Sequence, residues 1–336
     1  MNITADKDMM STQSLEIFTL GGLSIQREAK PVTGFASRKV EALVIYLACT
    51  KHPQPREVLA ELFWDERSQD RAMGNLRVVL TSLRKQLAPF VNITRDTVSL
   101  NLDENIWLDV SELEDLLIST RQPKSSPLQT TQVQQMEQAV TIYKGRFLDG
   151  FYVRDCTGFE NWVFREQERL QRVILDVISD LVSFYLETGE YHAGVQHATR
   201  LLEIDPLMEE AHYQMMLLLT HSGQRGAALK QYETCVRILQ DELDIEPSDE
   251  TRTLFQQIQS GEVKSRPQDP VRKIDAITQP PAFLNERDLT SEIHNPVFVA
   301  REQELEQLNS FLHNALAGKG QVAFVVGEAG KGKTAL

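Results

Sequence analysis

The sequence predicts a multidomain, mainly α-helical protein, with a small α+β domain near its start and the first elements of an α/β domain at its end. Three observations predict this: short strands and helices share the first hundred or so residues, helical periodicity dominates the middle, and an apolar strand precedes a Gly- and Lys-rich loop at the end. The length of 336 residues also exceeds one domain of about 100 to 200 residues. We expect five segments: a flexible N-terminus (1–14), the α+β domain (15–107), a helical domain (108–260), a linker (261–293) and the start of the α/β domain (294–336).

The α+β domain is expected to contain short strands and three helices. In chain order these are two strands at 15–26, a helix after Ser37, helices at 56–63 and 71–87, and a hairpin at 91–102. Gly21-Gly22 supplies the first turn, Ser37 is placed to cap the first helix, and Pro89 stops the third. In the second helix four apolar residues are expected to face inward: Val58, Leu59, Leu62 and Phe63. Strands, three helices and then a hairpin is the element order of a winged helix-turn-helix.

The third helix has two different faces. One is apolar and consists of Leu76, Val79, Leu80, Leu83 and Leu87, whereas the opposite face carries Arg77, Thr81, Arg84 and Lys85. A recognition helix needs this arrangement, because one face packs on the domain while the other lies in the major groove of DNA. The alternative is a solvated basic face on an ordinary helix; the winged-helix element order around it favours recognition.

Two other pairs of residues are candidates for DNA contact. Thr94 and Arg95 stand at the tip of the hairpin, where a wing would lie over the DNA backbone or the adjacent minor groove. Arg38 and Lys39 begin the first helix, where amides and positive side chains together can bind phosphate. For this second pair the alternative is that both side chains are merely solvated.

The charge distribution agrees with one DNA-binding surface on an acidic protein. The net charge of −13 by itself argues against nucleic acid, because phosphate binding needs local Lys and Arg. The stretch from Arg71 to Arg95, however, contains five basic residues and no acidic one, while the acidic excess lies farther along the chain. This distribution predicts one surface for DNA and others for proteins.

The helical domain is predicted from residue 107 onward, with a polar loop at 121–135, and it contains an internal repeat. Gly189, Ala193 and Arg200 stand 34 residues before Gly223, Ala227 and Thr234, and Pro206 and Pro247 close the two copies. A period of about 34 residues is that of the tetratricopeptide helix pair, in which glycine permits the turn and alanine lets the helices approach. Helices at 139–148 and 160–186 are expected to complete the stack.

A polar, Pro-containing stretch at 261–288 predicts an interdomain linker, and a phosphate-binding loop follows at the end of the chain. Residues 327–334 (GEAGKGKT) fit G-x-x-x-x-G-K-[ST] after the apolar strand 321–326. In this motif Gly327 and Gly332 let backbone amides face phosphate, Lys333 reaches the β and γ phosphates, and Thr334 holds Mg²⁺. No Walker B carboxylate follows, so we expect an incomplete site that does not hydrolyse ATP, with residues 321–336 mobile or irregular.

Other classes of protein receive no support from the sequence. It has no membrane-length apolar run, and its polar N-terminus lacks the layout of a signal peptide, so we expect a cytoplasmic, nucleoid-associated protein. The seven histidines form no ligand set, and three distant cysteines fit small buried hydrophobes. No cofactor or metal is therefore expected in this chain, nor enzyme activity.

Several phrases of the sequence resemble the Streptomyces antibiotic regulatory proteins. The N-terminal phrases GGLSI, SRKVEALVIYLA, REVLAELFW and NLRVVLTSLRKQL are similar to the OmpR-type winged helix of this family. The phrases YKGRFLDGF, ENWVFREQERL, LLEIDPLMEEAHYQMMLLLTHSGQRGAALKQYE and LDIEPSDET resemble its bacterial transcriptional activation domain. The segments FVAREQELEQLNSFL and VVGEAGKGKTAL look like the start of the ATPase domain of its large members, with Ala300 where the family usually has Gly.

The resemblance implies a transcriptional activator that binds direct repeats in promoters as a dimer or as side-by-side protomers. It also implies recruitment of RNA polymerase through its σ factor and α subunit, and regulation by the ATPase domain, with ATP and Mg²⁺, in the full-length protein. Two alternatives remain open: an ATP-binding signalling ATPase with accessory modules, and a repeat scaffold whose winged helix contacts only proteins.

Overall fold

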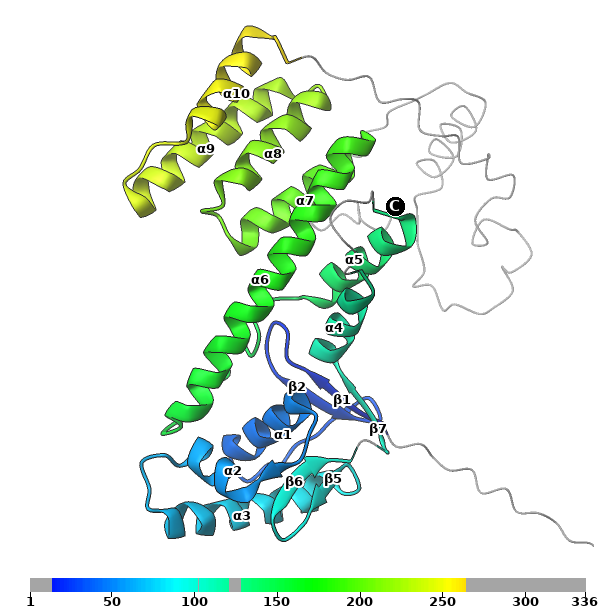
Figure 1. Ribbon diagram of the computed structural model, residues 1–336, viewed down its shortest axis with the longest axis vertical. Helices are drawn as coiled ribbons and strands as arrows, with labels where there is room; N and C mark the ends of the chain where they lie inside the picture. Colours follow the sequence, from blue (N-terminus) through cyan, green and yellow to red (C-terminus); the bar gives the residue numbers. More distant parts are fainter. Residues whose placement is uncertain (1–13, 102, 121–127, 264–336) are drawn as a thin grey trace, which may run out of the picture. The chain divides into compact units, whose positions relative to one another are not determined.

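The computed structural model describes residues 14–101, 103–120 and 128–263, all within one compact unit (Figure 1). The linker and the phosphate-binding loop that the sequence predicts lie outside the described residues. The molecule is mainly helical, with a small β region near its start. Its elements form an N-terminal α+β segment followed by a set of helices.

The α+β segment contains two small sheets and three helices. Its strands are β1 (Ser14–Phe18), β2 (Ser24–Arg27), β3 (Lys30–Pro31), β4 (Gln54–Pro55), β5 (Val91–Ile93), β6 (Thr97–Leu100) and β7 (Asn105–Leu108). Its helices are α1 (Arg38–Thr50), α2 (Arg56–Phe63) and α3 (Gln69–Leu87). The sheets have the strand orders β3-β2-β1-β7 and β4-β6-β5. The element order predicted for a winged helix is therefore confirmed.

Strand β7 corrects the predicted start of helical structure. The sequence predicts helical structure from Trp107 onward, but Trp107 lies in β7, which pairs in parallel with β1 through registers such as Glu16 with Trp107. The rings of Phe18 and Trp107 also pack together, with centroids 5.1 Å apart. Helix formation begins only at Asp109, so the strand after the hairpin returns to the first sheet and ends the α+β segment.

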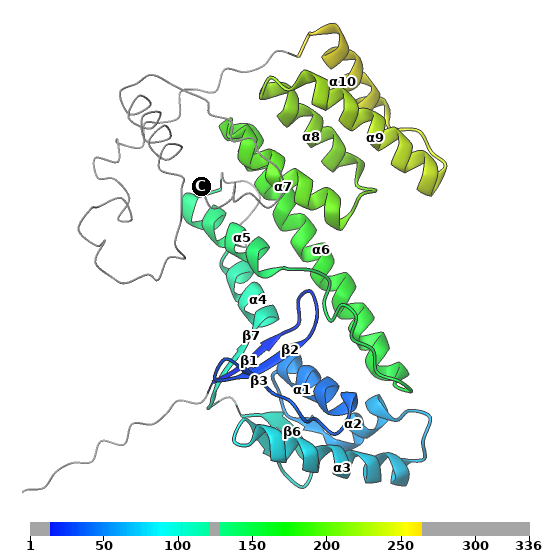
Figure 2. The ribbon, with the colours of Figure 1, turned by 180° about the vertical axis from the view of Figure 1, so that it is seen from behind.

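The helical part contains seven helices among the described residues. They are α4 (Asp109–Thr120), α5 (Thr130–Ile142), α6 (Thr157–Thr188), α7 (Tyr191–Ile204), α8 (Glu209–His221), α9 (Arg225–Leu243) and α10 (Asp249–Ser260). Helix α5 starts inside the predicted polar loop and ends before residue 148, because residues 146–148 instead bond to residues 19–21, with Leu20 and Phe147 forming a β-bridge. Both figures show α6 extending from α2 toward the later helices (Figures 1 and 2).

The helix pairs α6–α7 and α8–α9 contain the 34-residue repeat. Gly189 and Gly223 both have φ of 81°, a left-handed conformation that glycine adopts without a Cβ penalty. The small residues in the helix contacts are, however, one position later than predicted. Gly194 and Ala228 are buried, whereas Ala193 is half-buried and Ala227 exposed, and a Cβ at Gly194 would lie 2.6 Å from a methyl carbon of Leu218. The assignment to the tetratricopeptide type stays a prediction.

The buried residues of the α+β segment and of the helical part form one continuous cluster. At the joint, the rings of Phe63 in α2 and Phe159 in α6 stack with centroids 5.3 Å apart, and Trp162 packs on Phe159 at 5.4 Å. Val58, predicted to face inward, is 44% exposed, because Leu59 and Phe63 take the buried side of the short helix α2.

Cys156 and Cys235 are buried, as predicted, and Cys49 is partly buried. Burial raises the pKa of each of the Cys156 and Cys235 thiols to about 11.

Candidate nucleic-acid interface

Helix α3 is the core of the predicted interface. It begins at Gln69, two residues earlier than predicted, and ends at Leu87. The five residues predicted to form its apolar face are all buried: Leu76, Val79, Leu80, Leu83 and Leu87. This face packs against α1, α2 and β5, so the helix has a fixed orientation on the α+β segment.

The opposite face of α3 is exposed and basic. Arg77, Thr81, Arg84 and Lys85 are all exposed, and the charged groups of Arg77, Arg84 and Lys85 form no ion pair with any residue in the described part of the chain. The Thr81 hydroxyl donates to the carbonyl of Arg77 at 2.8 Å, which leaves its oxygen lone pairs as acceptors at the surface. The exposed face of α3 therefore carries three cations without an ion-pair partner in the described part of the chain, together with one hydroxyl that can accept a hydrogen bond.

Two further residues of this surface were missed by the sequence reasoning. The side chain of Val78 is 67% exposed, and Asn75, one turn before it, is also exposed. The helical spacing held the signal for Val78, because this position lies on the side of the helix opposite the stripe that begins with Leu76, Val79 and Leu80. An apolar side chain can contact a thymine methyl group, and an Asn amide can pair with the edge of adenine.

The β5–β6 hairpin is a wing whose tip is fixed by local hydrogen bonds. The Thr94 hydroxyl oxygen accepts from the amides of Asp96 and Thr97 at 3.3 and 2.9 Å, while the Arg56 guanidinium donates to the Thr94 carbonyl. The side chain of Thr94 thus stabilises the turn, whereas the side chain of Arg95 is exposed at the tip. Arg56 begins α2, so the second helix holds the wing in place.

The structure gives Arg38 and Lys39 partners within the protein. The guanidinium of Arg38 donates to the carbonyl of Tyr152 at 3.3 Å and lies over the ring of Phe151. The ammonium of Lys39 donates to the carbonyls of Phe63 and Asp155 at 2.6 and 2.8 Å. Both side chains therefore join α1 to the segment before α6, and a phosphate contact by either of them stays a prediction.

The residues predicted to bind nucleotide, Gly327, Gly332, Lys333 and Thr334, lie outside the described residues. Within the described part of the chain, no group of His, Cys, Asp and Glu side chains could hold a metal ion. None of the helices described there is long and apolar enough to cross a bilayer.

Comparison with protein families identifies the helical part. The profile of the bacterial transcriptional activator domain matches residues 108–259, which run from the end of β7 to the last turn of α10. The helical part, residues 108–259, is therefore similar to a bacterial transcriptional activator domain. The match begins at the last residue of β7, so the strand that closes the first sheet leads directly into this activator domain.

Known proteins agree with this assignment. The chain is 24% identical over 279 residues to the regulatory protein AfsR of Streptomyces griseus, covering 83% of this chain and 27% of the relative. It is 25% identical over 202 residues to AfsR of Streptomyces coelicolor, covering 60% of this chain and 20% of the relative. These matches support the predicted resemblance: the chain is similar to transcriptional regulators of the Streptomyces antibiotic regulatory protein type. It spans about a quarter of the length of the curated relatives that it matches.

A solved structure supports the fold. The structure of Mycobacterium tuberculosis EmbR in complex with a low-affinity phosphopeptide matches with a TM-score of 0.56 at 17% identity, covering 74% of this chain and 65% of that chain. The coverage extends beyond the activator domain alone, so the combination of an N-terminal α+β segment with a helical domain recurs in that protein.

Proposed function

We propose that this activator reads promoter DNA with the exposed face of α3, inserted in the major groove, while the β5–β6 wing lies over the adjacent backbone. The observation that carries the proposal is the rigid basic face of α3, whose cations make no ion pair in the described part of the chain. Opposite it, an entirely buried apolar face fixes the helix to the domain. An exposed cation without an internal partner can neutralise a phosphate or donate to a guanine edge at low cost.

Within this surface we assign different roles to different side chains. Arg77 and Arg84 contact guanine edges or phosphates, and Lys85 contacts phosphate as a point charge. Val78 supplies apolar contact for a thymine methyl group. Arg95 at the wing tip contacts the backbone or the minor groove, whereas Thr94 acts by holding the turn that presents Arg95.

We further propose that the activator domain positions protomers on direct repeats and recruits RNA polymerase through its σ factor and α subunit. The family supports this role, because the matched domain is one of transcriptional activators. In the full-length protein, a nucleotide-binding domain that includes Lys333 and Thr334 would set the active state with ATP and Mg²⁺.

The test is a band-shift titration of the upstream region of the protein's own gene, with Arg77→Ala and Arg84→Ala variants. A lost base contact is expected to cost about 1 to 3 kcal/mol in specific binding, or about 5- to 150-fold in affinity. A lost phosphate contact should instead weaken binding to all sequences and reduce the slope of log K against log salt by about 1.

The matched control is Arg237→Ala, because Arg237 is an exposed arginine on α9, far in sequence from the wing and α3. This control should bind as the parent protein does. Unchanged promoter affinity in both α3 variants would remove α3 as the reading helix. Absence of any salt-sensitive DNA binding by the parent chain would favour a protein-interaction scaffold instead.

A further inference from the structure

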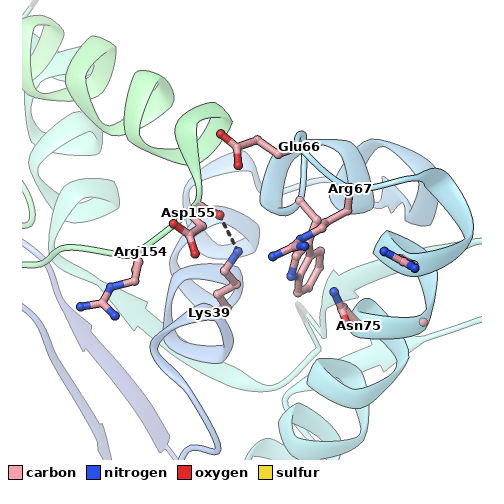
Figure 3. A pocket seen from close by; sticks show the side chains of 9 residues that line it. Lys39, Glu66, Arg67, Asn75, Arg154 and Asp155 are labelled. Carbon is pink, nitrogen blue, oxygen red and sulfur yellow. Dashed lines mark hydrogen bonds between the residues drawn. The ribbon is translucent and has the colours of Figure 1, made fainter.

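A cleft of about 650 Å³ lies beside the first turns of α3, where the α+β segment meets the activator domain (Figure 3). Its walls come from α1, from the loop between α2 and α3, from α3 itself and from the turn just before α6. Pockets of about 300 to 1,000 Å³ are the size that small molecules occupy. Asn75 lies on the DNA-reading face and also lines this cleft, whereas Arg77, Val78, Arg84 and Lys85, to which we assign the DNA contacts, do not line it.

The cleft is rich in positive charge. Four cationic side chains line it, Lys39, Arg67, Arg71 and Arg154, against two carboxylates, Glu66 and Asp155. The guanidinium groups of Arg67, Arg71 and Arg154 make no hydrogen bond or ion pair with any residue that the structure describes. Figure 3 shows the charged ends of Lys39 and Arg67 pointing into the same space. Converging cations repel one another, so an anion between them would be stabilised.

Lys39 provides a fixed charge in this wall. Its ammonium group donates to the carbonyls of Phe63 and Asp155, and it lies 5.0 Å from the centre of the Trp64 ring. An ammonium has three N–H donors, and these two bonds use two of them. The third donor is held in place without the usual entropic cost of ordering a lysine side chain.

The wall formed by α3 is open. A Cβ added at Gly74 would meet no atom within 4 Å, and the exposed Asn75 beside it offers an amide for further hydrogen bonds. The cleft therefore combines charge for a phosphate group with room and polar groups for the rest of a molecule.

We propose that this cleft binds a phosphorylated small molecule, with its phosphate held by Lys39, Arg67 and Arg71. Guanidinium groups suit this ligand because they donate paired hydrogen bonds to phosphate oxygens. The occupant touches α3 from the DNA-binding segment and the turn that leads into the activator domain. A bound molecule thus acts as an effector on both the DNA-binding segment and the activator domain.

The test measures binding of inorganic pyrophosphate to the full chain by calorimetry, without DNA. All proteins in the comparison carry Lys333→Ala, which removes the phosphate-binding lysine of residues 327–334. The parent of this series is expected to bind pyrophosphate saturably and to prefer it to citrate, a trianion without phosphate. The double variant Arg67→Ala/Arg71→Ala is expected to lose about tenfold or more in affinity, while Arg237→Ala binds as the parent does.

Thermal unfolding of each variant shows that the fold is retained, as expected for exposed side chains. Absence of binding by the parent, equal binding of citrate, or unchanged binding by the double variant overturns the proposal.

A phosphate of the DNA backbone is the other anion that could occupy the cleft. If the double variant binds promoter DNA as the parent does, the small-molecule assignment is supported; a weaker affinity with a shallower salt dependence assigns the cleft to DNA and overturns it. Because pyrophosphate binding is measured without DNA, its failure is distinguishable from failure of the proposed DNA reading.

Discussion

Replacing Asp109 with Asn should strongly destabilise the joint between the first sheet and α4. Asp109 is the first residue of α4, is 3% exposed, and accepts four hydrogen bonds. One carboxylate oxygen accepts from the amides of Thr19 and Leu20 at 2.6 and 2.8 Å. The other accepts from the Thr19 hydroxyl at 2.7 Å and from the amide of Val110 at 2.8 Å. Each oxygen thus serves two donors.

The size of the loss in free energy of unfolding follows from the number of hydrogen-bond donors that lose their acceptor. In Asn one of the two oxygens becomes an NH₂ group. If it replaces Oδ2, the amides of Thr19 and Leu20 lose their acceptor; if it replaces Oδ1, the Thr19 hydroxyl can accept from it and only the amide of Val110 loses its acceptor. A hydrogen bond to a charged group contributes about 1.5 to 3 kcal/mol, and an unsatisfied buried donor is costly. We expect Asp109→Asn to lower the free energy of unfolding by about 2 to 4 kcal/mol, from one unsatisfied buried amide and the loss of the charge on the remaining bonds, against a typical total of about 5 to 15 kcal/mol.

Urea-induced unfolding of the full chain measures this difference. Asp115→Asn is the matched control, because Asp115 is an exposed aspartate of the same helix. It should change the free energy of unfolding by no more than about 0.5 kcal/mol. A loss below about 1 kcal/mol in Asp109→Asn would refute the reasoning, since it would mean that the four bonds contribute almost nothing.

Two other changes test the helical part. Gly158→Ala should destabilise the protein by about 1 to 3 kcal/mol in thermal unfolding, because the added Cβ would lie 2.7 Å from the backbone oxygen of Leu62. The control Gly226→Ala has open space around the added Cβ and should be neutral or stabilising. Equal effects of the two substitutions would contradict the close approach of α6 to α2. Burial lowers the pKa of His212, although the hydrogen bond with the Pro206 carbonyl acts in the opposite direction. The folded state therefore favours the neutral ring, so this contribution to stability is present above about pH 6.5 and is lost as the pH falls. His212→Gln should therefore show a smaller loss of urea stability than the parent between about pH 7 and 5, and an unchanged pH dependence would count against this role.

The elements that could be predicted are those whose residue pattern involves neighbouring positions and repeats several times. Helix α3 has five apolar residues at helical spacing and a proline just after its end, so its buried face could be assigned correctly. The wing was also predictable, because a short turn at Arg95-Asp96 separates two strand-like runs. In both cases the residues that decide the structure lie within about twenty positions of one another.

The features that were not predictable depend on distant partners. Strand β7 has only four residues and pairs with β1, about 90 positions earlier, so no local pattern distinguishes it from the start of a helix. The roles of Arg38 and Lys39 depend on the carbonyls of Tyr152 and Asp155, which lie more than a hundred positions away. Similarly, the 34-residue period fits Ala193 with Ala227 as well as Gly194 with Ala228, and only packing decides which pair is buried.

The stacked rings of Phe63 and Phe159 limit how this protein can be recombined. A hybrid regulator cut between β7 and α4 would carry Phe63 without the α6 surface that covers it, and the receiving protein would gain an apolar patch in place of a contact. If α3 reads DNA as proposed, exchange of specificity between such regulators is better done by transplanting the outer face of α3 alone. Within that face, Arg77, Val78, Thr81 and Arg84 can be changed without uncovering the interior.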